Sequence, residues 1–114
     1  MMHKKIQIPA LHNVHVFVGS WAQVQAWVHR QDPYRYIEYD GKTEGCAFWF
    51  KTDDGFAYSC VWFPNRRPGV DVIAHEACHV FDHLCEILGI KTADRELRAL
   101  VTGYIAGKLW ALLR

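Results

Sequence analysis

The chain has 114 residues, of which 51% are hydrophobic and 22% are charged. This composition is typical of a folded globular protein and excludes an intrinsically disordered chain, and the length predicts one domain over residues 1–114. Thirteen basic and twelve acidic residues give a net charge of +1. We therefore expect no general electrostatic attraction to nucleic acid or to a membrane surface.

The N-terminal ten residues contain His and Lys but no apolar run, so a secretory signal is not expected. No two of the four cysteines form a C-x-x-C pair; they are Cys46, Cys60, Cys78 and Cys85. Without an export signal, this spacing is typical of unpaired, buried thiols in a reducing compartment. The sequence predicts a cytoplasmic protein.

The first half of the chain predicts a strand followed by a helix. Residues 14–19 are mostly apolar and β-branched, which favours a strand. Ser20 and Gln23 have the spacing of a capping box, in which the two residues satisfy each other's backbone N–H groups at a helix start. Asp32-Pro33 ends this helix. Its predicted buried stripe consists of Val24, Trp27 and Val28.

Aromatic and β-branched runs at residues 46–51 and 56–63 flank Thr52-Asp53-Asp54-Gly55, which is a strong hairpin signal. Residues 34–39 fit either a short strand or an extended loop. The sheet is therefore expected to have at least three strands.

A helix is predicted over residues 70–88, ending at Gly89. One face of this helix is apolar and contains Ile73, Ala77, Val80, Phe81, Leu84, Ile87 and Leu88. The opposite face contains Asp71, His75, His79, Asp82, His83 and Glu86. Three imidazoles and three carboxylates without Lys or Arg favour a cation site over an ordinary solvated face.

This helix carries the motif His75-Glu76-Ala77-Cys78-His79, an instance of H-E-x-x-H. Positions i and i+4 share a helix face, so His75 and His79 can bind one ion, and neutral imidazoles suit Zn²⁺. Glu76 lies about 100° around the helix from His75, where it can act as the general base on a zinc-activated water.

The last segment, residues 93–113, has almost no polar face. We expect this helix to be buried, either against the motif helix and sheet or in a homo-oligomeric interface. It is too short, and interrupted by Lys108, to span a bilayer. Gly103 and Gly107 share a side with Glu96, which predicts close packing along that side and directs Glu96 toward the two histidines.

Catalytic zinc normally has three protein ligands, and Glu96 is the predicted third. Asp94 is an alternative third ligand, and Asp82 is another, or it orients a ligating histidine from outside the coordination sphere. His83 is the remaining contender, or a group that faces the substrate or stabilises an oxyanion. Tyr104 lies two turns after Glu96, where its phenol either stabilises a catalytic oxyanion or packs in the core.

The H-E-x-x-H motif, followed by an acid seventeen residues after His79 in a second helix, resembles the gluzincin arrangement of zinc metallopeptidases. The order of elements is similar to that of small metallopeptidases encoded by bacteriophages and prophages. This resemblance implies an α+β zincin-like domain, with a sheet of three to four antiparallel or mixed strands packed on an N-terminal helix, the motif helix and a C-terminal helix. Metzincins are excluded, because Asp82 and Cys85 occupy the positions of their Gly and third His.

Two functions remain. The first is zinc-dependent hydrolysis of a peptide bond in a narrow protein substrate of phage or host, bound by strand addition to residues 56–63. The second is a non-catalytic module, stabilised by zinc, that binds a phage or host protein. Glu76 favours the first function, because a structural zinc site does not need a general base. A weaker third interpretation is that no metal binds.

Overall fold

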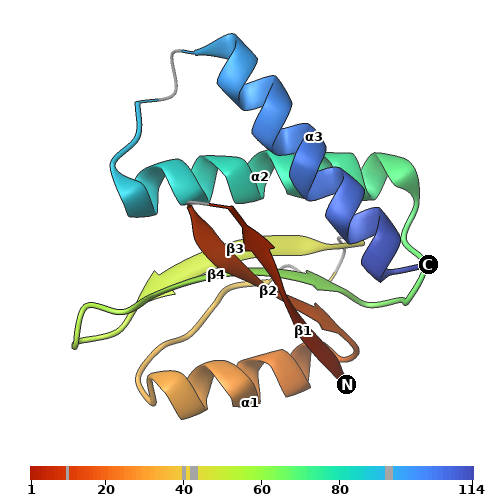
Figure 1. Ribbon diagram of the computed structural model, residues 1–114. Helices are drawn as coiled ribbons and strands as arrows, with labels where there is room; N and C mark the ends of the chain where they lie inside the picture. Colours follow the sequence, from red (N-terminus) through yellow and green to blue (C-terminus); the bar gives the residue numbers. More distant parts are fainter. Residues whose placement is uncertain (10, 40, 42–43, 92–93) are drawn as a thin grey trace.

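The computed structural model describes residues 1–9, 11–39, 41, 44–91 and 94–114. In these residues the elements follow the order β1 (Met2–Ile8), β2 (His12–Val18), α1 (Trp21–Gln31), β3 (Cys46–Lys51), β4 (Ala57–Phe63), α2 (Val70–Leu88) and α3 (Arg95–Leu112). The predicted α+β class, with a small mixed sheet and three helices, is confirmed (Figure 1).

The four strands lie in the order β1-β2-β4-β3. β1 and β2 are antiparallel, β2 and β4 are parallel, and β3 and β4 are antiparallel. Both edges of β4 are therefore occupied, so the prediction that residues 56–63 bind a peptide by strand addition is wrong. The outer strands of the sheet are β1 and β3.

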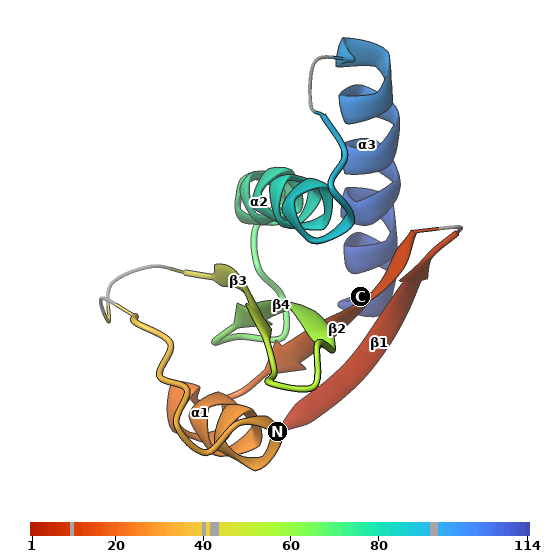
Figure 2. The same cartoon turned by 90° about the vertical axis from the view of Figure 1, so that its left-hand side faces the viewer.

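Helices cover both faces of the sheet, with α2 and α3 on one face and α1 on the other (Figure 1). The alternation of β2 explains this arrangement: Val14 and Val16 pack in the core that includes α2 and α3, whereas Phe17 packs in the core that includes α1. Along the sheet, α2 contacts β3 and β4 while α3 contacts β1. Figure 2 shows α3 beside α2, on the side away from β3.

The predicted helix signals are present. At α1 the backbone N–H of Gln23 donates to Ser20 Oγ at 3.2 Å, and Ser20 N–H donates to Gln23 Oε1 at 3.2 Å, which completes the capping box. At the end of α2, Gly89 has a φ of 68°, a left-handed conformation that glycine adopts without steric cost. Residues 34–39 form a loop rather than a strand.

α3 departs from the prediction that it is buried all round. Its buried residues are Ile105 and Leu109, whereas Leu100 is 76% exposed and Trp110 is 42% exposed. A Cβ added at Gly103 or Gly107 would meet no atom within 4 Å, so the predicted close packing along the glycine side is wrong. The helix packs on α2 and β1 through its opposite side. A homo-oligomer through the exposed side stays a prediction.

In the described part of the chain, no helix combines the length and the apolarity needed to cross a membrane.

Candidate metal centre

Three side chains of α2 converge at one point: His75, Glu76 and His79. The Nε2 atoms of the two histidines lie 3.1 Å apart, and one ligand atom from each of the three residues lies within 4.8 Å of the others. Two imidazole nitrogens bound tetrahedrally to one Zn²⁺ would be about 3.3 Å apart. The group can therefore hold a metal ion.

Glu76 is buried although it carries a charge in its ordinary state; its exposed fraction is 4%. Among the described residues, its Oε2 has no hydrogen-bond partner. Burial raises the pKa of Glu76, and the nearby His75 and His79 and a hydrogen bond with the backbone of Ala47 oppose that rise. An unpartnered buried carboxylate oxygen is costly unless a proton, an ion or a ligand satisfies it.

Gly45, immediately before β3, lets the sheet approach Glu76 closely. A Cβ at this position would lie 3.2 Å from Glu76 Cγ and 3.2 Å from Phe63 Cδ1. Any larger side chain would have to displace the carboxylate or the phenyl ring. The absence of a side chain at Gly45 thus makes room for the buried position of Glu76.

The three converging residues open into a cavity of about 1170 Å³ between α2, the start of β3 and the loop after α1. The helix contributes Asp71, Val72, His75, Glu76, His79 and His83 to its wall. The start of β3 and the loop contribute Tyr36, Glu38, Tyr39, Glu44, Gly45, Cys46 and Ala47. A cavity with a few convergent polar groups is the usual form of a small-ligand or substrate site.

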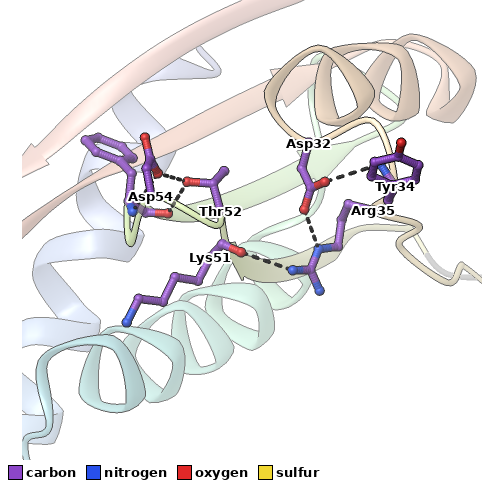
Figure 3. Close-up of polar contacts among 7 residues, drawn as sticks. Asp32, Tyr34, Arg35, Lys51, Thr52 and Asp54 are labelled. Atoms are coloured by element: carbon purple, nitrogen blue, oxygen red, sulfur yellow. Dashed lines mark hydrogen bonds and ion pairs between the residues drawn. The ribbon is translucent and has the colours of Figure 1, made fainter.

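The loop after α1, which forms one wall of the cavity, is held in place by hydrogen bonds at its start (Figure 3). The carboxylate of Asp32 accepts a hydrogen bond from Tyr34 N–H at 3.2 Å and pairs with Arg35 Nε at 3.4 Å. Arg35 Nη2 then donates to the carbonyl oxygen of Lys51 at 3.0 Å, which ties the loop to β3. Farther along, Gln25 of α1 donates to the carbonyl oxygen of Ile37 at 2.6 Å.

His83 lies one turn beyond His79 and also lines the cavity. Burial lowers its pKa, which favours a neutral imidazole, and its buried Nδ1 has no partner among the described residues. The rings of His79 and His83 are stacked, with centroids 6.4 Å apart. His83 is therefore placed to contact a ligand in the cavity, although it is not part of the three-residue group.

The structure does not bring Glu96 to the histidines. Glu96 is exposed in the first turn of α3 and belongs neither to the three-residue group nor to the cavity wall, because α3 lies on the side of α2 away from β3 (Figure 2). Tyr104 is 38% exposed on the same helix, beside Lys108, and also lies outside the cavity wall.

The two acids that the sequence offers as alternative third ligands, Asp82 and Asp94, have structural partners. Asp82 forms an ion pair with Arg98 at 2.9 Å, which links α2 to α3. Asp94 caps α3 by accepting hydrogen bonds from the backbone N–H groups of Glu96 and Leu97 at 2.9 and 3.1 Å. Asp82 thus links the two helices and Asp94 stabilises the start of α3, and neither belongs to the group around Glu76.

None of the four cysteines forms a disulfide, as predicted. Cys60 and Cys85 are buried, and burial raises their thiol pKa values; Cys78, in contrast with the prediction, is exposed. Cys46 is half-buried in the cavity wall.

Comparisons with protein-family models, with curated proteins and with solved structures found no match for this chain.

Proposed function

We propose that this protein is a zinc-dependent peptidase in which His75 and His79 hold Zn²⁺ and Glu76 is the general base. One observation carries the proposal: the buried Glu76 carboxylate, whose Oε2 has no hydrogen-bond partner among the described residues, forms a possible metal-holding group with two histidines whose Nε2 atoms are 3.1 Å apart. The unpartnered oxygen is what distinguishes this site from an amphipathic helix with two exposed histidines.

Zinc is the metal that suits these donors best. Imidazole nitrogens are intermediate in softness and bind Zn²⁺ well, whereas Ca²⁺ and Mg²⁺ require shells made almost entirely of oxygen. A catalytic zinc site also needs a position that the protein leaves open. Two histidines facing a cavity provide such open positions.

Bound Zn²⁺ would supply Lewis acidity, which lowers the pKa of water and polarises a carbonyl oxygen. Glu76 would take a proton from the attacking water and deliver it to the leaving amine. A base works best when its pKa is close to the working pH, and burial shifts the pKa of Glu76 upward in that direction. His83, at the cavity wall, would contact the substrate as a neutral hydrogen-bonding group.

The outer strand β3 is the proposed binding edge for the peptide. It begins at the cavity wall with Cys46 and Ala47, and β4 is its hydrogen-bonded neighbour in the described sheet. An extended peptide placed along this edge would pass close to Glu76. We include in this proposal the resemblance to gluzincins and to phage-encoded peptidases. We also include a cytoplasmic location, because four cysteines without a disulfide fit a reducing compartment.

A non-catalytic zinc-stabilised binding module is the second candidate. Two observations favour it: Glu96 does not complete a three-ligand site, and α3 exposes Leu100, Tyr104 and Trp110, which offer an apolar surface to a partner. In this case Glu76 would be dispensable.

The deciding experiment compares the zinc-loaded protein with Glu76→Gln and with Glu86→Gln as a matched control. Glu86 is an exposed acid of the same helix outside the cavity wall, where it accepts a hydrogen bond from Trp49 Nε1 at 3.0 Å. The substrate is an unfolded protein digested and analysed by mass spectrometry. We expect Glu76→Gln to keep its zinc and lose at least about 100-fold in cleavage rate, while Glu86→Gln cleaves normally. Cleavage that survives in Glu76→Gln, or a wild-type protein that binds zinc without cleaving, would support the binding module instead.

A further inference from the structure

The cavity wall is acidic, whereas the chain as a whole is nearly neutral. Glu38, Glu44 and Asp71 line it together with Glu76, and no Lys or Arg lines it among the described residues. The whole chain has thirteen basic and twelve acidic residues. One third of the acids thus gather at a single cavity, and they come from three segments: the loop after α1, the residues just before β3, and α2.

The charge remains negative when a metal is bound. Four carboxylates outnumber the two positive charges of a divalent ion, and three still do so if Glu76 is protonated. The buried Glu76 also points to a ligand, because it is 4% exposed and its Oε2 lacks a partner among the described residues. A cavity of this charge attracts cationic groups and repels anionic ones.

We propose that the site selects peptides with a Lys or Arg side chain next to the scissile bond, which this cavity accommodates. The proposal rests on the proposed peptidase function and names its substrate class. Glu38 and Glu44 approach the side chain from the loop and strand side, and Asp71 from the helix side. Tyr36, which is 71% exposed in the same wall, offers an aromatic face to the cation.

The anchored loop supports a selective role for this wall. Arg35 and Ile37 are tied to β3 and α1 through hydrogen bonds, so Tyr36 lies between two anchored residues and Glu38 directly follows the second. Since Glu38, Glu44 and Asp71 are exposed, each contributes modestly and salt screens its effect. We therefore expect the preference to appear in substrate binding and to weaken as ionic strength rises.

The test uses zinc-loaded Glu76→Gln, which we expect to bind peptides without cleaving them. Dye-labelled hexapeptides that carry Lys, Gln or Glu at one interior position are titrated by fluorescence anisotropy at about 20 mM and 300 mM salt. We expect the Lys peptides to bind about ten-fold more tightly than the Glu peptides at low salt, and the advantage to shrink several-fold at high salt. In Glu38→Gln/Glu44→Gln/Asp71→Asn, made in the same background, the preference should disappear while one zinc per chain and the unfolding temperature are retained.

The outcomes separate the two proposals. If all peptides bind equally, or the Glu peptides bind best, the basic preference is wrong and the peptidase proposal stands. If no peptide binds to the zinc-loaded protein, both are wrong. If the triple variant loses its zinc, the carboxylates are metal ligands and the specificity proposal is overturned. Replacing Glu86 by Gln in the same background is the control, because this acid lies outside the cavity wall.

Discussion

Two histidine pairs lie on different elements of this protein, and they differ in chemistry despite similar geometry. His75 and His79 of α2 have Nε2 atoms 3.1 Å apart. His3 of β1 and His15 of β2 place Nε2 and Nδ1 only 2.9 Å apart. The first pair adjoins the buried carboxylate of Glu76, whereas in the second pair His3 stacks on Phe17 and His15 packs at a tilt against Trp27 on the α1 face of the sheet.

The neighbouring charges decide what each pair can do. Burial, His3 and Lys5 lower the pKa of His15 to about 4, and burial and Lys5 also lower that of His3. These rings are neutral at pH 7, so one donates a hydrogen bond to the other, and the nearby ammonium group disfavours a second cation. Within the described residues, the group of three that could hold an ion is the one containing Glu76. A short distance between nitrogens is therefore insufficient to define a metal site.

The largest effect is expected when each pair loses one histidine. His79→Ala should weaken zinc binding by more than about 100-fold, because it removes a direct ligand. His3→Ala is the matched control and should leave zinc affinity unchanged. Competition with a chromophoric zinc chelator measures both constants. Equal losses of zinc affinity in the two variants would contradict the assignment of the metal site to the α2 histidines.

The second pair should instead control stability in acid. In the folded state His15 stays neutral down to about pH 4, whereas the unfolded chain protonates near the usual value of 6.5. The unfolded state therefore binds more protons in this window, and stability falls as the pH drops from about 6.5 to 4. Because the ring is only half-buried, His15→Gln should reduce this loss by about 1–2 kcal/mol.

Urea unfolding of the metal-free proteins at pH 7 and pH 4.5 measures that difference. Glu76 titrates in both proteins, so its contribution cancels in the comparison. An acid-induced loss of the same size in wild type and variant would show that the His3–His15 contact does not carry the pH dependence.

A smaller change is expected when the positive neighbour of the second pair is removed. Lys5 lies opposite His15 in the β1–β2 register and lowers its pKa. Lys5→Gln should raise the pKa of His15 by a few tenths of a unit, since burial remains the main cause. Two-dimensional NMR titration of the imidazole measures this shift, with Lys4→Gln as the control on the opposite face of the strand. A pKa that stays fixed, or falls, would contradict the electrostatic account.

The smallest expected effect concerns Glu96. Because this side chain lies on α3, away from the cavity, Glu96→Ala should change zinc affinity by less than about two-fold. The gluzincin resemblance predicts a sharp loss instead, so the same chelator titration decides between them. A large loss would mean that α3 moves toward the histidines when zinc binds.

Local signals in the sequence predicted most of the fold. The capping box at Ser20, the hairpin at Thr52-Asp53-Asp54-Gly55 and the stop at Gly89 each act within a few residues, and all three are present. The sequence does not predict β1, because the alternation of this strand is short: Ile6 and Ile8 are buried while Lys5 and Gln7 are exposed. An N-terminal strand with two buried residues gives too weak a pattern to distinguish from a tail.

The candidate site could be predicted only where it depends on helical spacing. His75, Glu76 and His79 share one turn of one helix, so their convergence follows from periodicity. The position of Glu96 depends on which side of α2 the last helix packs against, and the apolar residues of α3 fit either side. The sequence does not predict the roles of Glu38, Glu44 and Gly45. These residues lie in the segment between α1 and β3, where no periodic pattern indicates which way a side chain faces.

Anomalous diffraction at the zinc edge, from crystals of the zinc-loaded protein, tests directly whether His75 and His79 bind Zn²⁺. We expect one strong peak about 2.0–2.1 Å from Nε2 of both His75 and His79, with the Glu76 carboxylate beside it. A peak between His3 and His15, or no peak at the α2 histidines under saturating zinc, would contradict it.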